Sequence, residues 1–77
     1  MARDQYFVVL AEGEWKISYN HAHYGPYRSQ KEAIRSAIDA AHRAGERGVD
    51  AQVLVQGNDH KFRPEWTYGN DPYPPRA

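Results

Sequence analysis

The first part of the chain has the apolar pattern of a β-hairpin. Residues 5–11 and 14–20 are rich in β-branched and aromatic side chains, which favour strands. Glu12-Gly13 between them can form a tight turn, because glycine tolerates a positive φ. A loop of two or of four residues gives the same register, in which three pairs share one face: Leu10 with Trp15, Val8 with Ile17, and Tyr6 with Tyr19.

A second hairpin is predicted near the end of the chain, over residues 50–56 and 61–68. Its loop spans residues 57–60, and two or four loop residues again give one register. Pro64 cannot donate a hydrogen bond to a neighbouring strand, so it predicts a sheet edge or a bulge. The pairs on the apolar face are Val55 with Phe62, Val53 with Pro64, and Ala51 with Trp66.

Between the hairpins, residues 29–45 predict one helix. Ser29 and Glu32 form a capping-box pattern at its start, in which each side chain bonds a free backbone N–H. Gly45 or Gly48 is expected to end it. Asp39 can reach an arginine on either side at four-residue spacing, Arg35 and Arg43. The narrow apolar stripe consists of Ala33, Ile34, Ala37, Ile38, Ala41 and Ala44.

The segment before the helix, HAHYGPYR, contains Gly25-Pro26 and is predicted to be a loop. The fold class is therefore α+β of the type ββαββ. A right-handed crossover through the helix places the third strand antiparallel to the first. We expect a four-stranded antiparallel sheet of order 2-1-3-4 with the helix on one face, over Trp15, Ile17, Val53, Val55 and Trp66.

The opposite face of this sheet keeps apolar side chains on its two central strands. Phe7, Val9 and Leu54 lie there, with Lys16 and Arg63 nearby. One helix cannot cover both faces, so we expect something else to cover this one.

Composition limits the function classes. The 77 residues form a single domain, 1–77, with no cysteine and with ten basic residues balancing ten acidic ones. This balance argues against nucleic acid as a partner. The apolar run of residues 7–11 is too short for a signal peptide or a membrane span. We expect a cytoplasmic protein without membrane contact.

No residue pattern indicates catalysis or a cofactor. Ser29 is used by the helix cap, and no serine lies in a nucleophile elbow. His21 and His23 point the same way on an extended segment, but a zinc site needs three or four ligands. We therefore predict no catalytic residues, no cofactor and no metal, with this histidine pair as the weak metal candidate.

The chain closes on TYGNDPYPP, residues 67–75. Gly69-Asn70 can turn the chain, and Pro72 holds Asp71 extended. Residues 69–77 are predicted to be a proline-rich clasp or tail. As a clasp, the segment would lie near Phe7 and Val9 with Tyr68 or Tyr73 as its anchor. As a tail, it would bind an aromatic groove of a partner.

Four segments resemble a bacterial family of unknown function, DUF2188: EGEWKISY, SQKEAIRSAIDAAHR, VLVQGNDHKF and YGNDPYPP. The resemblance covers roughly residues 6–75, and its most specific element is the ending, with Asp71-Pro72 and a further proline. Members often have Asp-Gly where this chain has Asp59-His60. The resemblance implies a small bacterial cytoplasmic protein and supplies no activity.

The leading hypothesis is a non-catalytic binding or assembly module. A homodimer is favoured over a monomer, and an unknown protein partner stays open. The alternatives are a nucleic-acid-binding module that uses the open sheet face and, less favoured, a small-molecule enzyme or metal-binding protein. The candidate partner or clasp surface consists of Phe7, Val9, Lys16, Leu54, Arg63, Tyr68 and Tyr73.

Overall fold

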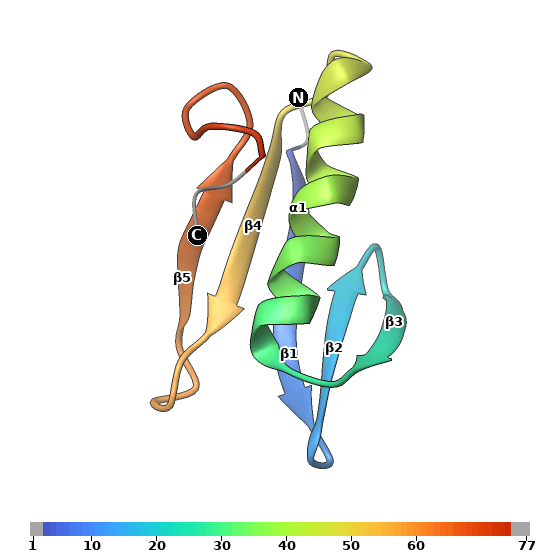
Figure 1. Cartoon of the computed structure of the whole chain (residues 1–77), viewed down its shortest axis with the longest axis vertical. Coiled ribbons are helices and arrows are strands. Elements are labelled where there is room, and N and C mark those ends of the chain that lie inside the picture. Colours follow the sequence, from blue (N-terminus) through green and yellow to red (C-terminus); the bar gives the residue numbers. More distant parts are fainter. Residues whose placement is uncertain (1–2, 75–77) are drawn as a thin grey trace.

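The fold is an open five-stranded sheet with one helix on one face (Figure 1). The computed structural model describes residues 3–74. The α+β class, the single helix and its place on one face are confirmed, whereas the predicted number of strands is wrong. The elements are β1 (Asp4–Ala11), β2 (Glu14–Tyr19), β3 (Ala22–Tyr27), α1 (Gln30–Glu46), β4 (Ala51–Gln56) and β5 (Phe62–Thr67).

The unpredicted strand is β3, in the segment expected to be a loop. It pairs with β2 in antiparallel fashion, with Ile17 opposite Tyr24 and Trp15 opposite Tyr27. The ladder is irregular between these two pairs, where Gly25-Pro26 lies. β3 is an edge strand, and an edge tolerates a proline that would break a central strand. Gly25-Pro26 therefore interrupts the pairing without ending the strand.

The predicted antiparallel direction of the third strand relative to the first is wrong, and this extra strand explains why. β3 reverses the chain once more before the helix, so β4 runs parallel to β1, with Tyr6 opposite Val53 and Val8 opposite Val55. The sheet is mixed and has the order β3-β2-β1-β4-β5. The order of the four predicted strands is confirmed within it.

The first hairpin has the predicted register. Leu10 pairs with Trp15 and Val8 with Ile17. The loop is the two-residue one, and both Glu12 and Gly13 have positive φ, at 53° and 78°, as a tight hairpin turn of this kind requires. The rings of Tyr6 and Tyr19 lie with their centroids 4.3 Å apart, in keeping with the third predicted pair.

The second hairpin has a different register. The Gly57 N–H donates to the Lys61 carbonyl oxygen at 2.8 Å, which leaves a three-residue loop ending at His60 with φ 64°. An odd loop length moves each side chain of the following strand to the other face. Gln56 therefore pairs with Phe62, and Leu54 with Pro64.

A register shift between Val53 and Leu54 then changes which residues pair further along β5. Val53 pairs with Trp66 instead of Pro64, so Trp66 returns to the helix side, where only 3% of its surface is exposed. The predicted edge position of Pro64 is confirmed, and the shift lies beside its partner Leu54.

The helix begins with the predicted cap. The Ser29 Oγ accepts the Glu32 N–H at 3.2 Å, while the Glu32 carboxylate accepts the N–H of Arg28 instead of that of Ser29. Gly48, with φ 90°, follows the C-cap residue Arg47 and so ends the helix. Arg35 Nε lies 3.7 Å from Asp39 Oδ1, one of the two predicted contacts of this aspartate.

The core lies between α1 and the central strands. Four helix alanines are fully buried, and Val8 and Val53 are the largest side chains with no exposed surface. Small side chains let the helix axis approach the sheet closely, which is the reason for the alanine stripe. Within residues 3–74, no helix is both long and apolar enough to cross a membrane.

Candidate functional site

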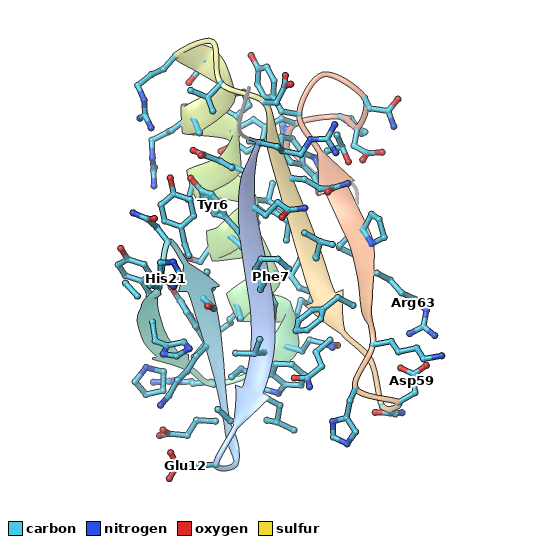
Figure 2. The ribbon with its side chains drawn as sticks, turned by 180° about the vertical axis from the view of Figure 1, so that it is seen from behind. Tyr6, Phe7, Glu12, His21, Asp59 and Arg63 are labelled. Atoms are coloured by element: carbon cyan, nitrogen blue, oxygen red, sulfur yellow. The ribbon has the colours of Figure 1, made fainter. Side chains whose placement is uncertain are left out.

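The sheet face opposite the helix carries an apolar cluster, the open-face patch, defined as Phe7, Val9, Leu54 and Phe62. Figure 2 views the sheet from this side and shows Phe7 near its middle. Phe7, Val9 and Leu54 are half-buried, and 40% of Phe62 is exposed. The rings of Phe7 and Phe62 meet edge to face, with their centroids 5.2 Å apart. Sequence reasoning missed Phe62, because only the three-residue loop places it on this face.

The border of the open-face patch is polar and nearly neutral. Lys16, opposite Val9 in the ladder, lies with its Nζ 3.8 Å from Glu14 Oε1. Gln56 accepts the Leu10 N–H through Oε1 at 3.0 Å, and Gln52 Nε2 donates to Thr67 Oγ1 at 3.4 Å. The border thus includes amides, hydroxyls and one internally paired cation.

Arg63 does not join Lys16 on this face. Its partner in the ladder is Val55, a helix-side residue, and its Nη2 lies 2.9 Å from Asp59 Oδ2 (Figure 2). The hydrogen bond from Arg63 lowers the pKa of the Asp59 carboxyl. The basic pair expected for a nucleic-acid surface is therefore not assembled.

The closing segment lies on the helix side of the sheet, beside α1. The Trp66 Nε1–H donates to the Pro72 carbonyl oxygen at 2.8 Å. The Tyr73 ring stacks on His42 with centroids 3.7 Å apart, and its hydroxyl donates to Asp39 Oδ1 at 2.8 Å, which raises the pKa of Tyr73. The expected position over Phe7 and Val9 is wrong, because Trp66 and α1 offer both rings and hydrogen-bond partners.

Further contacts hold the turn at the start of this segment. The Thr67 N–H donates to Asp71 Oδ2 at 2.8 Å, and the Thr67 carbonyl oxygen accepts the N–H groups of Asn70 and Asp71. The Tyr68 ring lies directly against Gly45, where a Cβ atom would collide with it. Residues 75–77 of the predicted tail lie outside the described part of the chain.

A concave surface, the tyrosine cleft, lies on the helix side of the sheet, between α1, β2 and β3. It has a volume of ≈ 290 Å³. The Tyr19 hydroxyl donates to Asp4 Oδ2 at 2.9 Å, and this hydrogen bond, with burial, raises the pKa of Tyr19 to about 12. The Tyr27 and Ser36 hydroxyls lie 3.0 Å apart. The residues that define the cleft are Tyr6, Tyr19, Tyr24, Tyr27, Ser36 and Arg43.

Sequence reasoning missed the tyrosine cleft because it depends on β3. A loop over residues 21–28 gives Tyr24 and Tyr27 no fixed place, whereas the strand sets both beside β2. The signal was present in the sequence as four tyrosines within residues 6–27, two of them next to glycine, proline or histidine. Turn residues hid a strand that carries aromatic side chains.

The histidine pair considered for a metal is split by a turn. His21 has φ 67° and follows Asn20 at φ 51°, while His23 lies in β3 opposite Ser18. The two are therefore not part of one extended run. Among residues 3–74, no three His, Cys, Asp or Glu side chains are grouped so that they could hold a metal ion.

Comparison with known proteins identifies a family. The family described as uncharacterized protein conserved in bacteria (DUF2188) matches residues 6–68. No curated protein and no solved structure matches the chain. The match ends before Asp71-Pro72, which lies in the most specific element of the resemblance. It includes β3, α1 and every strand of the sheet except the first two residues of β1. The chain therefore belongs to the DUF2188 family of uncharacterized bacterial proteins.

Proposed function

We propose that this protein is a non-catalytic assembly module that forms a symmetric dimer through the open-face patch. The observation that carries the proposal is the one-sided cover of the sheet. Both α1 and the described part of the closing segment pack on the same side, and Phe7, Val9 and Leu54 lie on the other side, on the adjacent interior strands β1 and β4. A second copy of the chain would bury these side chains.

The border of the patch favours a second copy over a partner of another chemistry. In a symmetric dimer the same patch meets itself, so its polar groups must complement themselves. Glutamine amides and hydroxyls both donate and accept, and Lys16 already has Glu14 beside it. The chain as a whole carries no net charge, so two copies do not repel each other strongly.

A dimer of standard size would use most of the open sheet face, the polar border included. The molecule measures 34 × 29 Å along its two longest axes, and the sheet lies in that plane (Figure 1). A standard interface buries about 800 Å² on each partner.

The nucleic-acid alternative has less support, because Arg63 pairs with Asp59.

Sedimentation velocity at micromolar concentration tests the proposal. We expect wild-type protein at twice the 8.9 kDa mass of one chain, and Phe62→Glu as a folded monomer, since the interface would bury an unpaired carboxylate among apolar side chains. Leu10→Glu is the matched control, because Leu10 is 51% exposed and lies outside the patch. It should remain dimeric. A wild-type monomer, or dissociation by both variants alike, would reject this interface.

A further inference from the structure

The helix leaves space on both of its flanks, and the two flanks differ. On the β5 side, the closing segment adds Tyr68 and Tyr73 around Trp66, with the ring centroids of Trp66 6.2 and 6.3 Å from theirs. On the β3 side lies the tyrosine cleft, of ≈ 290 Å³. The chain thus fills one flank with its own aromatic rings, and the other flank is a concave surface lined with rings.

The walls of the tyrosine cleft suit a flat apolar group. The Tyr6 and Tyr19 rings lie 4.3 Å apart at 36° and form a continuous aromatic surface. Tyr24, on the edge strand, is 52% exposed and borders the same cleft. Aromatic rings prefer offset or edge-to-face contacts with other rings, so a planar ring can contact several tyrosines at once.

Among the polar groups of the cleft, Arg43 is the one that favours a negative charge. The Tyr19 hydroxyl donates a hydrogen bond to Asp4, and the Tyr27 and Ser36 hydroxyls form a hydrogen bond with each other. Arg43 is the charged residue of the lining, and within residues 3–74 it makes no ion pair. A guanidinium presents a planar fork of donors that matches a carboxylate.

We propose that the tyrosine cleft binds a small aromatic carboxylate, with the ring against Tyr6, Tyr19 and Tyr24 and the carboxylate on Arg43. A cavity of this size is at the lower end of ligand sites and admits a molecule of about a dozen non-hydrogen atoms. Such a ligand binds with a Kd on the order of 1 mM. The proposal is independent of the dimer, because the open-face patch lies on the other side of the sheet.

A pair of probes that differ only in charge tests this site. We would titrate ¹⁵N-labelled protein with indole-3-acetate and, separately, with its neutral amide at low salt. Both should shift signals of β2, β3 and the Ser36 to Arg43 part of α1. The acid should bind roughly threefold to fivefold more tightly, the range expected for one exposed ion pair.

Three variants assign the contacts. Arg43→Gln should remove the preference for the acid and leave binding of the amide unchanged, whereas Arg35→Gln, which alters an arginine paired with Asp39, should keep the preference. Tyr24→Ala should weaken both probes. Absent shifts in β3, equal affinity for both probes, or an unchanged preference in Arg43→Gln would overturn the proposal. Phe62→Glu should bind like wild type, which separates this test from that of the dimer.

Discussion

At the scale of single residues, Gly45 shows how a neighbour outweighs an intrinsic preference. Glycine within a helix is about 1 kcal/mol less favourable than alanine, yet Gly45 is buried near the end of α1 beneath the ring of Tyr68. A methyl group there would collide with Tyr68 Cγ and both Cδ atoms. The residue is therefore explained by packing of the closing segment and not by helix formation.

The substitution Gly45→Ala should consequently destabilise the protein. Overpacking costs about 1–3 kcal/mol, which exceeds the gain in helix propensity, so we expect a net loss of about 1 kcal/mol in the free energy of unfolding. Urea denaturation followed by tryptophan fluorescence measures it. In a Tyr68→Ala background the collision is absent, and the same substitution should be neutral or stabilising. A stabilised Gly45→Ala in the wild-type background would contradict the packing.

At the scale of elements, the sequence predicted correctly those elements for which the turn residues, the caps and the apolar spacing indicate the same structure. The first hairpin, the helix cap and the helix face followed from Glu12-Gly13, Ser29 and the alanine spacing. The second register failed because His60 takes a left-handed conformation usual for glycine, which makes an odd loop. The prediction missed β3 because Gly25-Pro26 normally indicates a loop, and this one error also reversed the predicted direction of β4.

The closing segment is the element whose position depends most on tertiary contacts. Truncation after Tyr68 removes the Pro72 oxygen bonded to Trp66, the Asp71 carboxylate and the stacked Tyr73. Net contributions of about 0.5–1.5 kcal/mol for each hydrogen bond, offset by the entropy regained, give an expected loss of about 2 kcal/mol. Chemical denaturation and a red shift of tryptophan emission would report it.

Truncation after Pro74 is the matched control, because it keeps every contact described above. It should leave stability unchanged. The rival hypothesis, a proline-rich ligand for a partner's groove, makes the opposite prediction for the shorter chain. Full stability after removal of residues 69–77 would favour that hypothesis and reject the clasp.

At the scale of the whole molecule, cover by the helix decreases from the centre of the sheet toward β3. β1 and β4 form the parallel central pair, and Tyr6, Val8 and Val53 on them are buried. β3 pairs with β2 through an irregular ladder and bonds α1 through the Tyr27 and Ser36 hydroxyls, and four of its six residues are exposed. The free energy of local opening depends on how many buried contacts a segment makes, and not on whether the segment belongs to a sheet. Stability should therefore be graded across one continuous sheet.

Hydrogen exchange measures this gradient. Amides of β1 and β4 that bond across the ladder should exchange slowest, with opening free energies near that of global unfolding, and those of β3 fastest among the strands. The comparison should be repeated in Phe62→Glu, since a dimer through the open-face patch would add protection to the central strands. A gradient that persists in this variant belongs to the monomer, because β3 is an edge strand with four exposed residues. Equal protection of β3 and β1 would show that the tyrosine cleft is rigid without a ligand.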